Sequence, residues 1–215
     1  MTLITLSDPR SPVSEAYRTL RTNLSFSSLD EPIRTLVVTS PTPDEGKSTT
    51  IANLAVTMAQ GGRKTVLVDC DLRRPSLHTF FKCQSEPGLT NLLLEAEGEP
   101  ALQATEVDGL YLLSSGPLPP NPADLLGSKR MDQIIGKLKD VSDIVLFDAP
   151  PIIAVTDATI LGAKVDGVLL VISAGRTKRE HAQRAKDMLE KANVRIIGAA
   201  LTNAPKDSSV GAYYE

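Results

Sequence analysis

The feature that most constrains this chain is a short polar loop between an apolar run and a helix-like segment. The apolar run is Leu36–Val38, the loop is Ser40–Thr50, and the segment Ile51–Gln60 follows it. A strand, a tight loop that ends in Gly46-Lys47-Ser48 and a helix are the context that a phosphate-binding loop requires. Backbone N–H groups and the positive end of the helix dipole attract an anion there. The sequence therefore predicts a loop that binds nucleotide phosphates.

Several loop residues suit this chemistry. Gly46 lets the backbone approach a phosphate closely, Lys47 can reach the β- and γ-phosphates, and the Ser48 hydroxyl can bind Mg²⁺. The consensus Gly-x4-Gly-Lys-Ser is incomplete, because Pro41 replaces its first glycine. The residues predicted to contact the nucleotide from this loop are Asp44, Glu45, Gly46, Lys47, Ser48 and Thr49.

Two further apolar runs end in carboxylates. Val66–Val68 leads to Asp69 and Asp71, and Ile144–Phe147 leads to Asp148. An aspartate alone often ends a strand by turning the chain. Here, however, the carboxyl ends of parallel strands would lie beside the phosphate-binding loop. Since Mg²⁺ keeps several waters and takes few carboxylates, we expect a Mg-ATP site in which Ser48, Asp69 and Asp148 hold the metal directly or through water.

Composition and length are those of one globular domain. The chain has 215 residues, of which 41% are hydrophobic and 23% charged, and its net charge of −3 gives no reason to expect nucleic acid as a partner. Met1–Asp8 lacks the pattern of a signal peptide, and no run approaches the roughly 18 apolar residues of a membrane span. The two cysteines indicate neither a disulfide framework nor a zinc site. We therefore expect a cytoplasmic protein.

Strand and helix patterns alternate along the chain. Strands are predicted at 34–40, 65–69, 109–113, 143–147, 167–173 and 194–202, and helices at 15–25, 51–60, 76–81, 90–95, 128–139, 156–164 and 177–192. This alternation predicts a single α/β domain over residues 1–215, a doubly wound, mostly parallel sheet of the P-loop NTPase type with helices on both faces.

Three segments fall outside that alternation. Residues 1–13 carry two prolines and are expected to form an extended arm, with Ser14 as the N-cap of the first helix. Gly116–Pro122 is too rich in proline for a helix or a central strand, which predicts a surface loop. Residues 205–215 are expected to form a flexible tail.

The three nucleotide motifs together resemble those of the bacterial tyrosine kinases of capsule and exopolysaccharide synthesis, which share their Walker A, A′ and B scheme with MinD/ParA-type ATPases. Pro41–Thr49 matches Walker A, Val66–Arg73 matches Walker A′, and Ile144–Pro150 matches Walker B. Ser14–Asn23 is similar to the family's Glu-x2-Arg-x2-Arg segment, and Gly116–Leu126 is similar to another family stretch.

The resemblance implies an ATP- and Mg²⁺-dependent protein tyrosine kinase that phosphorylates its own C-terminal tyrosines in trans. Tyr213 and Tyr214 are the implied acceptors. It implies a ring-like homo-oligomer with contacts from Glu15, Arg18 and Arg21, although their spacing alone favours a solvated helix face. It also implies other protein tyrosine substrates, a role in regulating polysaccharide synthesis and export, and membrane association through the cytoplasmic segment of a membrane activator, a polysaccharide co-polymerase.

Roles for the site residues follow from this chemistry. Lys47 would neutralise charge on the transferring phosphoryl group. Either Asp69 or Asp71 would accept the proton of the tyrosine hydroxyl, whose pKa of about 10 requires a base at neutral pH. Arg73 would brace the site or a phosphate. By resemblance to related ATPases, Asn203 would read the adenine edge, with an asparagine turn as the nearly equal alternative.

Two other functions remain open. A MinD/ParA-type ATPase switch would carry a lysine early in the loop, whereas positions 40–43 are Ser-Pro-Thr-Pro, and no amphipathic membrane helix follows the last predicted strand. A non-catalytic nucleotide-binding regulator of a membrane polysaccharide complex would retain every site residue, so the sequence does not distinguish it from a kinase.

Overall fold

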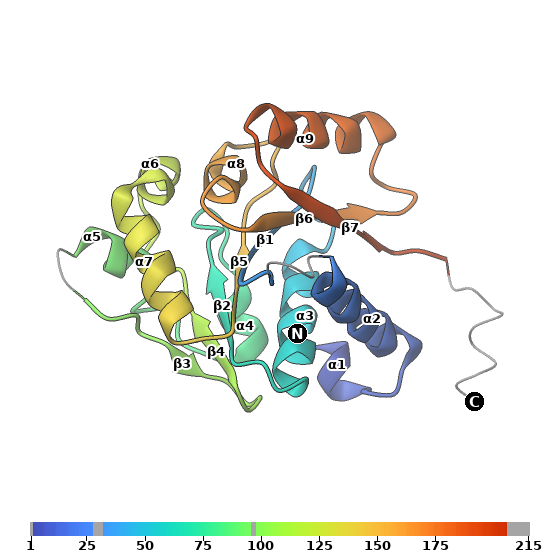
Figure 1. The fold of residues 1–215 in the computed structure, drawn as a ribbon, viewed down its shortest axis with the longest axis horizontal. Helices are drawn as coiled ribbons and strands as arrows, with labels where there is room; N and C mark the ends of the chain where they lie inside the picture. The colour runs from blue at the N-terminus through green and yellow to red at the C-terminus, as the bar shows by residue number, and fades with distance from the viewer. Residues whose placement is uncertain (1, 28–31, 96–97, 206–215) are drawn as a thin grey trace.

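Within the described residues, seven strands form one sheet in the order β3-β4-β2-β5-β1-β6-β7 (Figure 1). The structure is a computed structural model that describes residues 2–27, 32–95 and 98–205. Only the β3–β4 pair is antiparallel among these strands, which confirms the predicted mostly parallel sheet. The strands are β1 (Thr35–Thr39), β2 (Thr65–Asp69), β3 (Gln103–Ala104), β4 (Leu110–Leu113), β5 (Ile144–Asp148), β6 (Gly167–Ser173) and β7 (Ile196–Thr202).

Helices cover both faces of the sheet (Figure 1). Alternate strand residues supply two separate cores, because successive side chains point to opposite faces: Val37 belongs to one cluster, Leu36 and Val38 to the other. The helices are α1 (Ile4–Ser7), α2 (Pro12–Phe26), α3 (Lys47–Gln60), α4 (Leu77–Phe81), α5 (Leu89–Leu94), α6 (Pro122–Gly127), α7 (Lys129–Asp140), α8 (Asp157–Gly162) and α9 (Arg179–Lys191).

The central strands bring the three motifs together. β1, β2 and β5 are buried along their whole length, which explains why each is a continuous apolar run. β5 lies between β2 and β1, and Asp148 is in register with Asp69 on one side and Val38 on the other. The carboxyl ends of these strands therefore meet beside the loop that leads from β1 into α3.

The predicted extended arm at residues 1–13 is wrong. Residues 4–7 form the helix α1, in which Thr5 is buried and bonds Asn53 of α3 through both its backbone N–H (3.1 Å) and its hydroxyl (2.9 Å). The following helix, α2, begins at Pro12, because proline is tolerated in a first helical turn. Its N-cap is Ser11 rather than Ser14.

Two short elements escaped prediction. β3 has two residues and lies at the antiparallel edge of the sheet. α6 begins at Pro122, the last residue of the predicted loop Gly116–Pro122, and again has its proline in the first turn. The predicted ends of the other elements differ from the observed ones by at most a few residues, as expected where helices fray.

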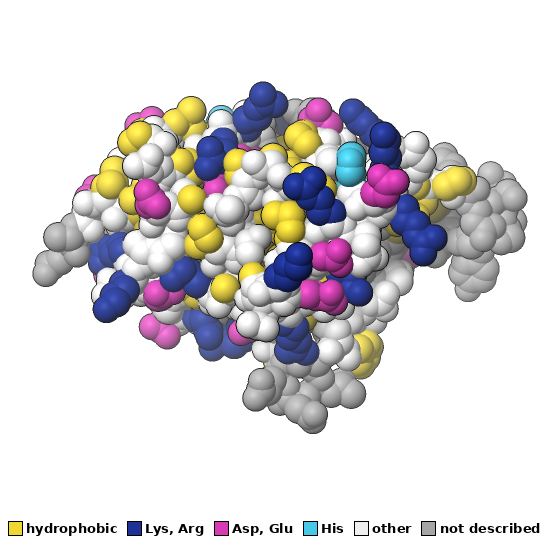
Figure 2. Space-filling model, turned by 90° about the horizontal axis from the view of Figure 1, so that it is seen from above, with side chains coloured by type: hydrophobic (Ala, Val, Ile, Leu, Met, Phe, Trp, Pro, Cys, Tyr) yellow, Lys and Arg dark blue, Asp and Glu magenta, His cyan; other side chains and the backbone are white. Residues whose placement is uncertain are grey.

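The surface is mixed in charge. On the face seen in Figure 2, Lys and Arg side chains are interspersed with Asp, Glu and apolar side chains, in agreement with the small net charge of −3. None of the helices in the described ranges has the length and apolar character that crossing a bilayer requires.

Candidate functional site

A cavity of about 710 Å³ lies at the carboxyl ends of the central strands. Three segments line it: the phosphate-binding loop with the first turn of α3, residues 71–76 after β2, and residues 150–155 after β5. This volume is in the range of small-molecule sites. Its position at the carboxyl ends of parallel strands is also the one at which ligands bind in open α/β sheets.

The loop conformation depends on two residues with positive φ. Asp44 has φ 60° and Gly46 has φ 87°, and α3 begins directly afterwards at Lys47. The left-handed region is open to glycine and is tolerated by aspartate better than by most other residues. The N-terminus of α3 consequently faces the cavity with its backbone N–H groups available to an anion.

Glu45 holds the first half of the phosphate-binding loop in place through hydrogen bonds to Thr42. Its side chain is buried, at 2% exposure, and its Oε1 accepts hydrogen bonds from the Thr42 backbone N–H (2.9 Å) and from the Thr42 hydroxyl. The Thr202 hydroxyl donates to the Glu45 carbonyl at 2.8 Å. Glu45 thus fixes the part of the loop from which Pro41 removes the consensus glycine. Thr42-x-x-Glu45 has the spacing of a capping box, a signal that could have revealed this bond.

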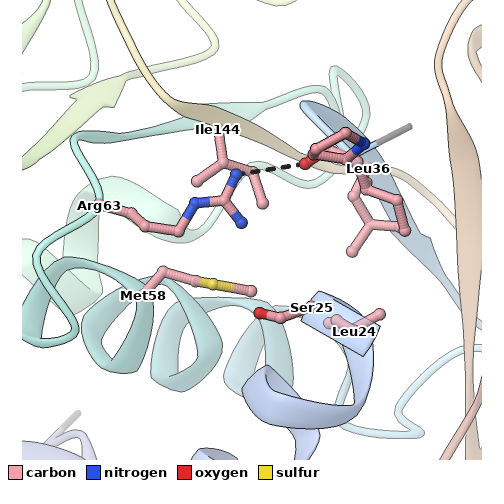
Figure 3. Close-up of a pocket in the computed structure, with 8 residues that line it drawn as sticks. Leu24, Ser25, Leu36, Met58, Arg63 and Ile144 are labelled. Atoms are coloured by element: carbon pink, nitrogen blue, oxygen red, sulfur yellow. Dashed lines mark hydrogen bonds between the residues drawn. The ribbon is translucent and has the colours of Figure 1, made fainter. Parts of the chain in front are cut away.

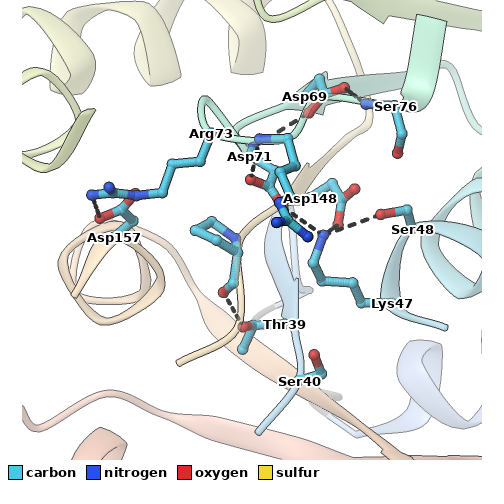
Figure 4. A network of polar contacts seen from close by, with 12 residues as sticks. Thr39, Ser40, Lys47, Ser48, Asp69, Asp71, Arg73, Ser76, Asp148 and Asp157 are labelled. Carbon is cyan, nitrogen blue, oxygen red and sulfur yellow. Dashed lines mark hydrogen bonds and ion pairs between the residues drawn. The ribbon is translucent and has the colours of Figure 1, made fainter. Parts of the chain in front are cut away.

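Lys47 connects the loop to the carboxylates of the other two motifs (Figure 4). Its Nζ lies 2.8 Å from Oδ2 of Asp71, 3.5 Å from Oδ1 of Asp148 and 3.1 Å from the Ser48 hydroxyl. Burial opposes the charge of Lys47, but Asp148 and Asp71 outweigh it and raise the pKa of the amine. Lys47 therefore keeps its positive charge at the wall of the cavity.

Asp69 and Asp71 differ in position. Asp69 does not line the cavity, since its Oδ2 accepts the backbone N–H groups of Ser76 (3.0 Å) and Leu77 (2.9 Å). Burial raises the pKa of Asp69 to about 7, and the neighbouring Asp148 adds to this effect. Asp71, which is 4% exposed, lines the cavity and pairs with Lys47.

The residues at this edge fit a magnesium ion. Both carboxylate oxygens of Asp148 are buried and lack a hydrogen-bond partner in the described part of the chain. Burial raises the pKa of Asp148, although Lys47 and the Ser48 hydroxyl oppose that shift. A buried carboxylate beside a hydroxyl and a phosphate-binding loop offers the oxygen ligands that Mg²⁺ prefers. A role for Asp69 toward the metal stays a prediction, and its bonds to backbone amides favour contact through water.

Arg73 braces α8. Its guanidinium donates to both oxygens of Asp157, at 2.9 and 3.1 Å, and Asp157 is fully buried at the start of that helix. The pair joins the segment after β2 to the segment after β5, so it holds two walls of the cavity together. Asp157 was not among the predicted site residues, because no local motif marks a partner that is 84 residues away.

Comparisons with known proteins agree with this arrangement. The ParA family, described as NUBPL iron-transfer P-loop NTPase, matches residues 33–203. Tyrosine-protein kinase YwqD of Bacillus subtilis is 46% identical over 214 residues, which is 98% of this chain and 90% of that protein. The chain belongs to the bacterial tyrosine kinases of the ParA-like P-loop NTPases.

Solved structures support the same family. The kinase domain of Escherichia coli tyrosine kinase ETK superposes on this kinase with a TM-score of 0.91 at 33% identity, covering 97% of this chain and 82% of that one. The chimeric protein CapA2B2 gives a TM-score of 0.90 at 35% identity, covering 95% and 90%. The cell-division ATPase MinD of Pyrococcus furiosus is more distant, with a TM-score of 0.66, 27% identity and coverage of 78% and 71%.

The predicted oligomer contacts of the kinase lie on α2. Glu15 and Arg18 pair with each other at 2.7 Å, whereas Arg21 donates to the Thr57 carbonyl of α3 at 2.7 Å. Glu15 and Arg18 therefore form a local pair, while Arg21 already holds two helices of its own chain together. Their contact with another subunit stays a prediction.

Asn203, predicted to contact the nucleotide, is not among the residues that line the cavity. Asn203 has φ 53° and donates to the Ser173 hydroxyl at 2.9 Å, which is the turn that the sequence left open. Its contact with adenine stays a prediction. Tyr213 and Tyr214 lie outside the described residues.

A smaller pocket of about 120 Å³ lies at the opposite edge of the sheet (Figure 3). Arg63 reaches across it above Met58, and the Arg63 guanidinium donates to the carbonyls of Ile33 (3.3 Å) and Asp143 (3.1 Å). Its other lining residues are mainly apolar. The guanidinium bonds carbonyls at the start of β1 and β5, so this pocket belongs to the framework of the sheet.

Proposed function

We propose that this kinase transfers the γ-phosphoryl group of Mg-ATP to Tyr213 and Tyr214 of a neighbouring copy. The observation that carries the proposal is a polar group at the cavity, where Lys47, Ser48 and Asp71 line the wall and Lys47 also pairs with the buried Asp148 behind them. The family supplies the tyrosine kinase activity. The choice of acceptor and the transfer between copies are our inference.

Each residue of this group has a distinct task in this reaction. Lys47 leaves its carboxylate partners and binds the phosphate oxygens, whose negative charge it neutralises during the transfer. Ser48 and Asp148 would hold Mg²⁺, which when bound neutralises charge on the phosphates. Asp71 takes the phenol proton, because it lines the cavity and Asp69 does not. The phenol oxygen then bonds to the γ-phosphorus, the bond from that phosphorus to its bridging oxygen breaks, and ADP leaves.

The described tyrosines are poor acceptors. Tyr17 is partly buried against α3, and this burial raises the pKa of its hydroxyl. The ring of Tyr111 lies under the Lys64 amine, 5.6 Å from it. The remaining two tyrosines of the chain are Tyr213 and Tyr214. This leaves the C-terminal pair as the preferred acceptors.

The wider role follows the family resemblance. We infer that the kinase forms a ring-like homo-oligomer through Glu15 and Arg18, phosphorylates other protein tyrosines, and regulates capsular or exopolysaccharide synthesis and export. Its activator would be the cytoplasmic segment of a membrane protein. In a ring, tethering raises the local concentration of the acceptor tail, to the order of millimolar for short flexible linkers.

Two variants test transfer between copies. Lys47→Met protein has acceptor tyrosines but no activity, and Tyr213→Phe/Tyr214→Phe protein has activity but no acceptors. When the two are mixed with Mg-ATP, we expect phosphate on the first protein alone, in its C-terminal peptide. If neither protein is labelled while the wild type is, transfer occurs within one chain and the proposal is wrong.

A further inference from the structure

Arg74 is exposed at the rim of the nucleotide cavity, next to a carboxylate that lines it. Its backbone N–H donates to Oδ1 of Asp71 at 3.0 Å and to the Asp71 carbonyl at 3.2 Å, which closes a turn. Both residues line the cavity, but Asp71 is buried and Arg74 is exposed. The turn therefore fixes the backbone of a basic residue at the entrance, with its N–H bonded to the proposed base.

The two adjacent arginines differ in their partners. Arg73 is held by both oxygens of Asp157. Over the described ranges of the chain, the Arg74 guanidinium makes neither a hydrogen bond nor an ion pair. A guanidinium presents a planar fork of donors that matches a carboxylate. Arg74 thus offers the cavity entrance an unused site for an acidic side chain.

An apolar strip forms another part of the cavity wall. Pro150, Pro151, Ala154 and Val155 line it, and all but Pro150 are at least partly exposed. Such a surface suits the flat ring of a phenol, whose hydroxyl end still requires a polar partner. A tyrosine side chain could lie on this strip and reach Asp71 with its hydroxyl while its backbone, and the next residue, stayed at the rim.

We propose that Arg74 and this strip form an acceptor subsite for a tyrosine that is followed by a carboxylate. The inference rests on the proposed function, in which the acceptor sequence is Tyr213-Tyr214-Glu215. Tyr214 would lie on the apolar strip, and the Glu215 carboxylate would pair with Arg74. Asp44 lines the cavity from the phosphate-binding loop, so its charge directs an acidic acceptor away from that side. The substrates of this subsite are therefore acidic tyrosine segments.

A charge exchange tests the subsite. The kinase is the Tyr213→Phe/Tyr214→Phe protein with or without Arg74→Glu, and the acceptor is the Lys47→Met protein with or without Glu215→Lys. Arg184→Glu, on the exposed side of α9, is the matched control for a reversed arginine. Acceptor concentration is varied at saturating Mg-ATP, phosphate in the C-terminal peptide is quantified, and MgADP affinity is measured by calorimetry.

We expect Arg74→Glu to lower kcat/KM for the acceptor at least about tenfold, mainly through KM, while MgADP affinity stays within about twofold. The Glu215→Lys acceptor should restore most of this loss with the Arg74→Glu kinase, and Arg184→Glu should have no effect. Equal labelling by both kinases, no rescue by the exchanged acceptor, or an equal loss of MgADP affinity would each overturn the subsite. If the kinase with Arg74 labels no acceptor, the proposed function fails and the subsite with it.

Discussion

At the amino ends of the central strands, Asp166 accepts the backbone N–H groups of Arg34 and Thr35, each at 2.8 Å. At the carboxyl ends of these strands, both oxygens of Asp148 are buried and accept no hydrogen bond within the described part of the chain. Burial opposes ionisation at both places. The N–H donors outweigh it and lower the pKa of Asp166, whereas the pKa of Asp148 is raised.

This difference separates charges that hold the fold together from charges that await a ligand. A carboxylate bonded to backbone amides stabilises the native state, whereas at Asp148 the Lys47 amine, 3.5 Å away, does not outweigh the cost of burying the charge. Arg34 and Arg63 at the amino ends of the strands likewise donate to carbonyls of their own chain. The charged residues at the amino ends of the strands therefore stabilise the sheet, and we propose that those at the carboxyl ends serve the reaction.

Removing one carboxylate at each end of the strands should test this comparison most clearly. We expect Asp148→Asn to lower kcat by about 10²–10³-fold or more, because the metal site loses its charge, while stability at pH 8 is unchanged or higher. Asp166→Ala should keep kcat but lower the free energy of unfolding by about 1–3 kcal/mol, since two N–H donors lose their acceptor. Urea unfolding and single-turnover kinetics on both variants measure stability and activity. Equal losses of stability and of kcat in the two variants would contradict the comparison.

The next prediction separates the two carboxylates after β2. Asp71→Asn should lower kcat by about 10²–10⁴-fold, as expected for loss of a general base. The folded pKa of Asp69, about 7, exceeds the ordinary aspartate value of 3.8, so the native state binds the extra proton and wild-type stability should fall as pH rises from about 4 to 7. Asp69→Asn should flatten that slope in urea titrations. A larger kcat loss in Asp69→Asn than in Asp71→Asn would reverse the assignment.

A smaller effect is expected at Glu45, which lies near the carboxyl ends of the strands but acts as a framework residue. Glu45→Ala removes the acceptor of the two Thr42 bonds and should weaken MgADP binding about tenfold, because the unbound loop becomes less ordered. Glu45→Gln keeps an acceptor oxygen and should restore most of the affinity. Equal affinities in the alanine and glutamine variants would show that the bond to Thr42 does not organise the loop.

The smallest changes in the monomer are expected on α2. Glu15→Ala/Arg18→Ala removes a half-exposed ion pair within one helix, so stability should change by less than about 1 kcal/mol while light scattering reports a smaller assembly. Arg21→Ala should instead lower stability, because it removes the hydrogen bond by which α2 is joined to the Thr57 carbonyl of α3. If the double variant keeps the wild-type mass, Glu15 and Arg18 are a solvated pair.

The sequence could predict features that are encoded locally. Gly46-Lys47-Ser48 and the aspartates that end β2 and β5 are each adjacent to a buried apolar strand, and parallel strands must bring such ends together. The helix α1 could not be predicted in this way, since four residues do not form a stable helix alone and Thr5 depends on Asn53, 48 residues later.

The sequence predicted which residues lie at the site better than it predicted the role of each. Asp69 and Asp71 are equivalent in sequence, but Asp69 accepts the backbone N–H groups of residues 76 and 77, whereas Asp71 pairs with Lys47. The same holds for Arg73 and Arg74, of which one meets Asp157 and the other does not. Such differences arise from tertiary contacts that no local pattern records.

The most direct test of the account is the intact mass of the kinase after incubation with Mg-ATP, followed by mapping of the C-terminal peptide. We expect added phosphate on Tyr213 or Tyr214 in the wild type and none in Lys47→Met, whose circular dichroism should match that of the wild type. Release of ADP without phosphate on the protein would contradict the account and show a nucleotide-driven switch instead of a tyrosine kinase.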